Sequence, residues 1–300
     1  DPGTYWSPHG GLPQWIAVPL ESPAAGPLFV TWDSTGYTYQ NVGAAPRDYV
    51  LHVSSDSTDG RNGTWYEAHS VTGNQVRSRV DAISAAGARW VRLQTLSVGS
   101  YGPQLRRLEV FEAAPTPRQD GWLILGDSIT AQSFHPGRAT QFAATVGALA
   151  PGYAPFSIGA GTGGDTAAEG QLRLAAALAG WPPGTYVGLA YGTNDATRGV
   201  PVTTFKARLE QMARSILAAG CTPVIARIPY NKNGNLPAYV GAIDALTTEL
   251  NLPPGPDLHS WFRAHPEELS SDTVHPNAQG EASIQRLWGE AAVRAYRWPE

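Results

Sequence analysis

The chain has 300 residues, of which 42% are hydrophobic and 15% charged, and its formal net charge is −4. It carries no basic stripe and no apolar run long enough to cross a bilayer, so we predict no nucleic-acid partner and no membrane span. The length suits one large domain or two ordinary ones. Ten tryptophans and twelve tyrosines, many beside Gly and Pro, favour a secreted or extracytoplasmic location.

Residues 1–112 are predicted to form an all-β domain. Short segments rich in β-branched and aromatic residues recur between Gly-Pro, Asp-Gly and Asn-Gly turn signals, and no helical period of useful length appears. A β-sandwich is the expected outcome. Its strands are expected at Gln14–Val18, Leu28–Trp32, Asp48–Ser54, Thr64–Ser70, Gln75–Val80, Arg89–Leu96 and Leu105–Phe111.

The same segment resembles the discoidin-like, galactose-binding β-sandwich modules, which have a jelly-roll fold. The resemblance lies in four packing patterns, at Gln14–Val18, at Tyr49–Asp56 with Trp65 after it, at Ala88–Leu93 and at Leu105–Phe111. It implies either a carbohydrate-binding module with a glycan ligand or an appendage that positions the next domain. Asn62-Gly63-Thr64 is read either as an N-glycosylation acceptor or as a plain Asn-Gly turn.

Residues 113–120 form a linker by composition, and residues 121–300 then alternate apolar strand runs with helical stretches. This alternation predicts an α/β domain with a parallel sheet and crossover helices, here a flavodoxin-like three-layer αβα arrangement. Strands are expected at Trp122–Leu125, Pro155–Ile158, Thr185–Tyr191, Thr222–Ile228 and Pro256–Leu258. Helices are expected at Ala139–Leu149, Thr203–Ala219 and Pro237–Leu250, and after Asn277, which can cap the last one.

Four short polar motifs fall at strand ends or just before the final helix. They are Gly126-Asp127-Ser128, Gly163-Gly164-Asp165-Thr166, Gly192-Thr193-Asn194-Asp195 and Asp272-Thr273-Val274-His275. Because ligands bind at the carboxyl ends of the strands in open α/β sheets, we expect all four motifs to meet in one crevice.

The set resembles the SGNH (GDSL) hydrolase superfamily, in this order and over Gly121–Arg297, with Gly170 and Arg173 also matching downstream of the second block. Gly159 departs from the pattern, because that block often begins with Asn, and a supporting hydrogen bond is therefore in doubt. The resemblance implies a catalytic triad. Ser128 would be the nucleophile, His275 its base and Asp272 the group that fixes the histidine tautomer.

The resemblance also implies an oxyanion hole. Its donors would be the backbone N–H groups of Ser128 and Gly164 and the side-chain amide of Asn194. Asp127 and Asp195 are expected to order their turns rather than to react. Tyr191, Tyr230 and Trp261 are read either as substrate-pocket residues or as core residues.

Other reactive residues are given structural roles. Cys221 is the only cysteine and is expected to be buried, and His135 and His259 are assigned surface or packing positions. No cluster has metal-ligand spacing, so we predict neither metal nor cofactor. The run from Gly159 to Gly164 matches the dinucleotide fingerprint, but it follows the second strand and lacks the acid about 20 residues on, so nucleotide binding is disfavoured.

The sequence therefore predicts a two-domain serine esterase that forms an acyl-enzyme without a cofactor. The appended sugar-binding-like module favours an acetyl esterase acting on O-acetylated carbohydrates. The alternatives are a lipase, arylesterase or thioesterase on short-chain acyl esters, and a glycan-binding protein with an inactive hydrolase-like domain.

Overall fold

A computed structural model describes residues 5–36, 41–112, 120–135, 140–153, 155–231 and 236–298. The chain divides into two compact units. The first comprises Asp1–Pro117 with Gly180–Pro182, and the second comprises Arg118–Ala179 with Pro183–Glu300. The predicted linker, residues 113–120, lies outside the described residues except for Asp120.

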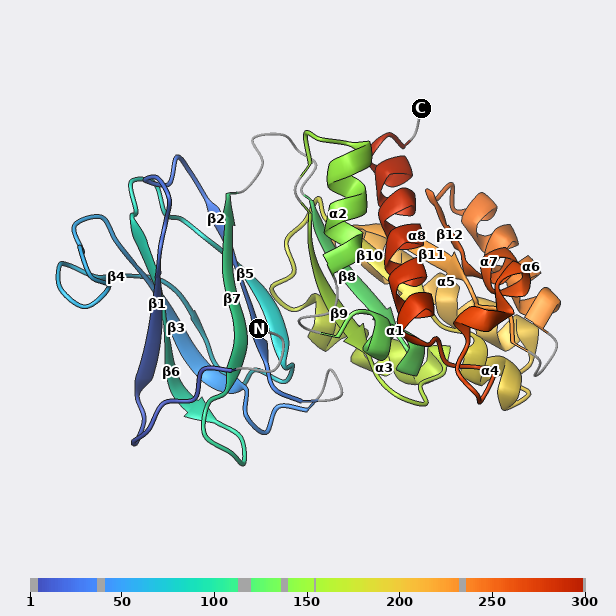
Figure 1. Cartoon of the computed structure of the whole chain (residues 1–300), viewed down its shortest axis with the longest axis horizontal. Coiled ribbons are helices and arrows are strands. Elements are labelled where there is room, and N and C mark those ends of the chain that lie inside the picture. The colour runs from blue at the N-terminus through green and yellow to red at the C-terminus, as the bar shows by residue number, and fades with distance from the viewer. Residues whose placement is uncertain are drawn as a thin grey trace. The chain divides into compact units, whose positions relative to one another are not determined.

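The first unit contains two antiparallel sheets (Figure 1). All seven expected strands are present, with boundaries shifted by at most three residues. The sheet orders are β1-β6-β3-β4 and β5-β2-β7. The strands are β1 Gln14–Pro19, β2 Leu28–Ser34, β3 Pro46–Ser54, β4 Tyr66–Val71, β5 Ser78–Ile83, β6 Trp90–Val98 and β7 Leu105–Glu112.

One apolar core joins the two sheets of this unit. Along β3, Tyr49 and Leu51 are fully buried while Val50 between them is not, which is the alternation expected of a sheet with one covered face. Tyr49 meets Trp32 of β2 edge-on, with ring centroids 5.4 Å apart. The predicted two-sheet packing is therefore present. The jelly-roll connectivity and the discoidin-like kinship stay predictions.

The Asn62 side chain orders the loop between β3 and β4. Its Oδ1 accepts hydrogen bonds from the Thr58 N–H at 2.8 Å and from the Ser57 hydroxyl at 3.2 Å, and its Nδ2 donates to Thr58 Oγ1 at 2.7 Å. A glycan on Nδ2 would compete with this last bond. The geometry favours the turn over the glycosylation acceptor.

The second unit is built on a five-stranded parallel sheet of order β12-β11-β10-β8-β9. In chain order this is the 2-1-3-4-5 arrangement of flavodoxin-like folds, whose ligand crevice lies where the connections diverge, between β8 and β10. The predicted α/β fold is confirmed. The strands are β8 Gly121–Gly126, β9 Phe156–Gly161, β10 Tyr186–Ala190, β11 Thr222–Arg227 and β12 Pro254–Asp257.

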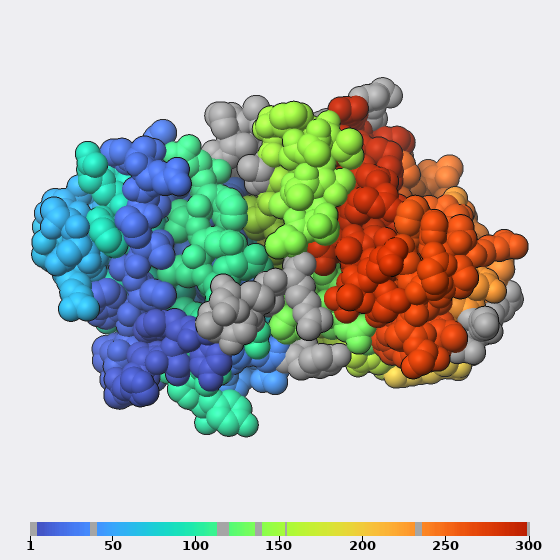
Figure 2. All heavy atoms as spheres, in the orientation of Figure 1, coloured from blue at the N-terminus to red at the C-terminus, as the bar shows by residue number. Residues whose placement is uncertain are grey.

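Helices cover both faces of this sheet (Figure 1). On one face, α2 and α8 lie side by side, as Figure 2 also shows, and Gly289 permits this approach, because a Cβ there would lie 2.8 Å from Thr145 Cβ. On the other face, α5 packs between α3 and α6. The helices are α1 Ser128–Ser133, α2 Thr140–Leu149, α3 Ala167–Leu178, α4 Thr193–Thr197, α5 Val202–Ala218, α6 Leu236–Glu249, α7 Leu258–Ala264, the 3-10 turn η1 Pro266–Glu268, and α8 Ala278–Tyr296.

The four expected helices correspond to α2, α5, α6 and α8, whereas α1, α3, α4 and α7 were not expected. Asn277 caps α8 as predicted, accepting from the Gln279 and Gly280 N–H groups. None of the described helices is long and apolar enough to cross a membrane.

Trp122 fixes β8, the strand that leads into Ser128. Its side chain is fully buried and stacks on Tyr186 of β10 with centroids 4.7 Å apart. Its Nε1–H donates to the Tyr296 hydroxyl of α8 at 3.1 Å. The strand is thus tied both to the next strand and to the last helix, and all six of its residues are buried.

The glycines that resemble a dinucleotide fingerprint serve close packing instead. Gly159 and Gly161 lie inside β9 rather than in a loop after it. A Cβ on Gly159 would lie 2.4 Å from the Phe134 carbonyl oxygen, and one on Gly161 would lie 2.3 Å from the Ala131 nitrogen. Both glycines let α1 and the residues after it approach the sheet, which accounts for the pattern without a nucleotide.

Candidate active site

Ser128 stands at the carboxyl end of β8, as the first residue of α1. Asp127 caps that helix, with its Oδ1 accepting from the Ile129 N–H at 2.9 Å. The backbone N–H of Ser128 belongs to the first helical turn, whose donors have no partner within the helix. The side chain is half-buried, so the hydroxyl is held by rigid structure and still reaches solvent.

The turn from Ser270 to His275 orients the histidine. The Ser270 N–H donates to the His275 carbonyl at 2.8 Å. Asp272 Oδ1 accepts from the N–H groups of Val274 and His275, each at 2.9 Å. Asp272 Oδ2 lies 2.6 Å from His275 Nδ1. The hydrogen bond from His275, followed by those from the backbone, holds the pKa of Asp272 well below its usual range.

The structure brings Ser128 and His275 together although 147 residues separate them. Ser128 Oγ lies 2.8 Å from His275 Nε2. With Asp272 on Nδ1, the imidazole would carry its proton on Nδ1 and present a lone pair to the hydroxyl. The serine, histidine and aspartate predicted to act together thus form one continuous hydrogen-bonded chain.

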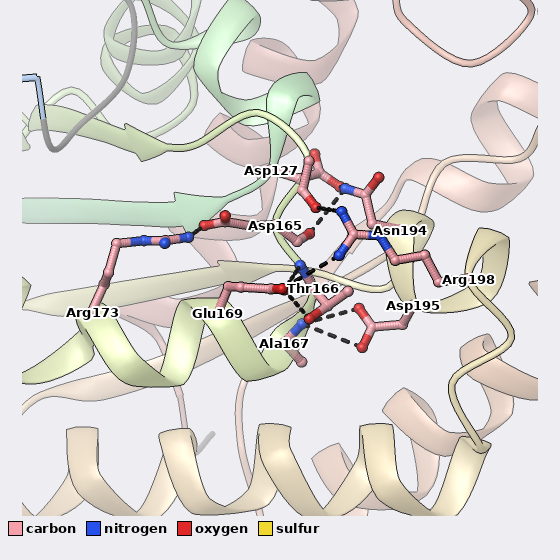
Figure 3. A network of polar contacts seen from close by, with 10 residues as sticks. Asp127, Asp165, Thr166, Ala167, Glu169, Arg173, Asn194, Asp195 and Arg198 are labelled. Carbon is pink, nitrogen blue, oxygen red and sulfur yellow. Dashed lines mark hydrogen bonds and ion pairs between the residues drawn. The ribbon is translucent and has the colours of Figure 1, made fainter.

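The two other predicted donors belong to segments that contact the neighbours of Ser128. The Asn194 amide donates to the Asp165 carbonyl at 2.9 Å and, at 3.5 Å, faces Asp127 Oδ2, so it touches the neighbours of both Gly164 and Ser128 (Figure 3). Gly164 has φ +81°, a backbone conformation that favours glycine. A Cβ on Gly163 would lie 4.0 Å from Ser128 Cβ, so the loop after β9 borders Ser128.

Asp127 orders its own turn, as expected, whereas the Asp195 carboxylate holds the backbone of another segment. The Asp195 carboxylate accepts from the Ala167 N–H, at 3.0 Å to Oδ2, and thereby fixes the start of α3. Burial raises the pKa of Asp127 to about 7 and that of Asp195 to about 6. These two groups are buried structural acids with weakened acidity.

Glu169 and Arg198 are polar residues of the site that the sequence motifs did not include. Thr166 and Glu169 form a capping box at the start of α3, a helix that the sequence analysis also missed. The spacing Thr-x-x-Glu was the available signal. Arg198, at the end of α4, donates from Nη2 to the Gly164 carbonyl at 2.7 Å. No local sequence pattern predicts this long-range contact.

The matches downstream of the second block also receive structural roles. Gly170 lets α3 pack on Tyr191, because a Cβ at Gly170 would lie 2.3 Å from Tyr191 Cζ. Arg173 pairs with Asp165. Tyr191 is only 1% exposed, as the core interpretation expects, and a substrate-pocket role for it stays a prediction.

Tyr230 and Trp261 make packing contacts. Trp261 donates from Nε1 to Glu268 Oε2 at 2.8 Å. The Arg286 guanidinium lies over the Trp261 ring, with Cζ 4.3 Å from the ring centroid. Tyr230 meets His259 edge-on, with centroids 5.6 Å apart. A substrate-pocket role for these two residues stays a prediction.

His259 and Cys221 occupy the packing positions expected of them. Burial lowers the pKa of His259 and raises that of Cys221, which is 3% exposed and lies 3.6 Å from Thr185 Oγ1. Within the described ranges, no group of three or more His, Cys, Asp or Glu side chains could hold a metal ion.

The flavodoxin-like sheet thus carries a serine, a histidine and an aspartate that are joined by hydrogen bonds at its carboxyl edge. Residues 124–282, more than half of the chain, match the model of the GDSL-like lipase/acylhydrolase family, and the chain belongs to that family. The expected SGNH-type hydrolase is confirmed at this level. A comparison with curated protein sequences finds no match.

Solved structures share this fold at low sequence identity. The YXIM protein of Bacillus subtilis is 16% identical, with a TM-score of 0.52 over 95% of this chain and 82% of that one. An acetylxylan esterase of Geobacillus stearothermophilus is 18% identical, with a TM-score of 0.50 over 58% and 94% of the two chains. A lipase/acylhydrolase of Enterococcus faecalis is 23% identical, with a TM-score of 0.50 over 61% and 99%.

Proposed function

We propose that this chain hydrolyses acyl esters at Ser128 through an acyl-enzyme. The observation that carries the proposal is the chain of two contacts, 2.8 Å from Ser128 Oγ to His275 Nε2 and 2.6 Å from His275 Nδ1 to Asp272 Oδ2. Both lie within the range in which a base can take a hydroxyl proton and be oriented by a carboxylate.

In the first half-reaction, Ser128 Oγ attacks the ester carbonyl carbon while His275 Nε2 takes the hydroxyl proton. The tetrahedral oxyanion is stabilised by the N–H groups of Ser128 and Gly164 and by the Asn194 amide. The imidazolium then gives its proton to the leaving alcohol oxygen, and the carbon–oxygen bond to that alcohol breaks. In the second half-reaction water attacks the acyl carbonyl carbon while His275 Nε2 takes a proton from it. The imidazolium then returns this proton to Ser128 Oγ as the carbon–oxygen bond to Ser128 breaks, and the carboxylic acid leaves.

The substrate that we favour is an acetyl ester on a carbohydrate, and the front unit is proposed to be a discoidin-like glycan-binding module. This proposal rests on the pairing of the two units and fits an extracytoplasmic location. The likeness to an acetylxylan esterase, at 18% identity, carries the fold alone. Lipase, arylesterase and thioesterase activities on short-chain acyl esters are the competing substrate classes.

Hydrolysis of p-nitrophenyl acetate by the full chain tests the reaction. We expect turnover that is lost in Ser128→Ala and in His275→Ala, and wild-type turnover that is insensitive to chelators. A panel of acetylated sugars, fatty-acyl esters, aryl esters and thioesters then ranks the substrate classes. A wild-type chain that binds glycans and hydrolyses no ester would identify the rival, a glycan-binding protein with an inactive hydrolase-like domain.

A further inference from the structure

The short helix α4 and the residue after it contact the backbone between β9 and α3, and the start of α3, at three places (Figure 3). The Asn194 amide donates to the Asp165 carbonyl at 2.9 Å, and the Asp195 carboxylate accepts from the Ala167 N–H at 3.0 Å. Arg198, the residue that ends α4, donates from Nη2 to the Gly164 carbonyl at 2.7 Å. Three side chains within five residues therefore determine the path of the loop that carries Gly164.

The Arg198 guanidinium is itself held in place. Its Nη1 lies 3.3 Å from Glu169 Oε1, while Glu169 Oε2 accepts from the Thr166 N–H at 2.7 Å. The Arg198 N–H also donates to the Asn194 carbonyl at 2.9 Å, so the two side chains extend from one helical turn. A planar guanidinium held between a carbonyl and a carboxylate keeps little conformational freedom. This suits a side chain that positions another group.

Gly164 needs such a hold more than another residue would. With φ at +81° and no Cβ, its backbone has several accessible conformations of similar energy. The Gly164 carbonyl shares its peptide plane with the Asp165 N–H, which donates to the Thr162 carbonyl at 3.3 Å and closes the turn that contains Gly164. Without the contact from Arg198 this peptide could rotate and open the turn, and the orientation of the Gly164 N–H would no longer be fixed. The donor proposed for the oxyanion can therefore be lost without any change in Ser128 or His275.

We propose that Arg198 is a positioning residue for the oxyanion hole: by holding the Gly164 carbonyl, it keeps the Gly164 N–H aimed at the developing oxyanion. The inference rests on the proposed esterase function. Its rival is a purely structural role, in which the pairs with Gly164 and Glu169 only stabilise the fold. The Arg198 side chain is 52% exposed, so its removal opens no core cavity.

The test compares Arg198→Met, Arg198→Lys and a matched control, Arg214→Met, in the full chain. Arg214 is an exposed arginine of α5 that pairs with Glu210 on its own helix. The measurements are kcat and KM for p-nitrophenyl acetate, the Kd of phenylboronic acid, which forms a tetrahedral adduct with an active-site serine, and Tm. Binding of the adduct reports the oxyanion hole without turnover.

For Arg198→Met we expect kcat to fall about tenfold, part of the roughly hundred- to thousandfold loss that follows complete removal of such a donor. The Kd of phenylboronic acid should rise by a similar factor, while KM stays within about twofold because the ground state makes less use of the hole. Arg198→Lys should restore part of the lost kcat and part of the affinity for phenylboronic acid, since an ammonium can also donate to the Gly164 carbonyl. Arg214→Met should match the wild type.

Three results would overturn the inference. An active wild type that requires Ser128, with unchanged kcat in Arg198→Met, would remove Arg198 from the oxyanion site and leave the esterase function intact. A fall in kcat that follows a lowered Tm and leaves the Kd of phenylboronic acid unchanged would show the structural role. A wild type inactive on every ester would remove the proposed function and the inference together.

Discussion

The two sides of the candidate active site are built in opposite ways. The proposed base side is one exposed turn, in which the side chains of Asp272 and His275 are 50% and 31% exposed. The hydrogen bonds that orient Asp272 and join it to His275 run within residues 270–275. The proposed oxyanion side consists of segments that follow β8, β9 and β10. It includes two buried acids, Asp127 and Asp195, that are at most 2% exposed. The base is thus oriented by local geometry and the donors by tertiary packing.

This difference in exposure shifts the pKa values of the carboxyl groups in opposite directions. At Asp272, hydrogen bonds from His275 and the backbone favour the charged form and lower the pKa. At Asp127 and Asp195, burial dominates and raises the pKa. Three aspartates of one site therefore respond differently to pH because they differ in exposure.

Removing groups from the base side should have the largest effects. His275→Ala is expected to lower kcat by at least about 10⁴-fold. Asp272→Ala should cause a loss of kcat that is smaller by about one to two orders of magnitude, because a backbone carbonyl can also orient the histidine ring. Steady-state kinetics with p-nitrophenyl acetate measures both. Equal activity in the wild type and Asp272→Ala would make this aspartate a structural residue only.

Asn194→Ala tests the oxyanion side. It removes one donor and is expected to lower kcat roughly hundred- to thousandfold, with the fold retained because the side chain is only half-buried. Circular dichroism checks the fold. A variant as active as the wild type would exclude Asn194 from the oxyanion hole.

Asp127→Asn tests the buried acids through pH. The pKa of Asp127 is raised from 3.8 to about 7 in the folded chain, so its contribution to stability is complete below about pH 4 and is lost as the pH rises through about 7. The loss amounts to about 1.4 kcal/mol per pH unit between those values. Asparagine keeps an acceptor for the Ile129 N–H and has no proton to lose.

Urea unfolding at pH 5 and pH 8 measures this effect. The free energy of unfolding should fall less between the two pH values in Asp127→Asn than in the wild type, although Asp195, with its pKa raised to about 6, keeps part of the decline. Identical pH dependence in the two proteins would show that Asp127 does not titrate in this range.

The smallest expected effect concerns the backbone of the base turn. Thr273 has φ +60°, a left-handed conformation that is unfavourable for a β-branched residue. Thr273→Asn should raise the free energy of unfolding by about 1 kcal/mol, seen as an increase of about 2–4 °C in Tm.

The reverse substitution provides its control. Asn251 has φ +49° in a loop of the same unit, and Asn251→Thr should lower Tm by a similar amount. If Thr273→Asn is less stable than the wild type, contacts of the threonine side chain outweigh the backbone term.

The sequence by itself predicted the α/β fold, the seven strands of the front unit and the contact between Asp272 and His275. These features depend on short-range patterns, namely an unbroken apolar run before Gly126, segments rich in β-branched and aromatic residues between turn signals in residues 1–112, and an Asp three positions before a His. Such patterns act within a strand or a single turn, so they are visible in a linear string. The four short or unexpected helices α1, α3, α4 and α7 lacked a long apolar stripe and were missed, although Thr166 and Glu169 signalled α3.

Only the tertiary structure decided which groups meet. It placed Ser128 Oγ 2.8 Å from His275 Nε2, buried Tyr191 against Gly170 and joined Arg198 to the Gly164 carbonyl. It also gave Gly159 and Gly161 a role in close packing against neighbouring residues, which accounts for their spacing without a nucleotide-binding loop. These outcomes depend on how the parallel strands are ordered and how closely helices approach them, because side chains far apart in sequence acquire neighbours only when the sheet has assembled.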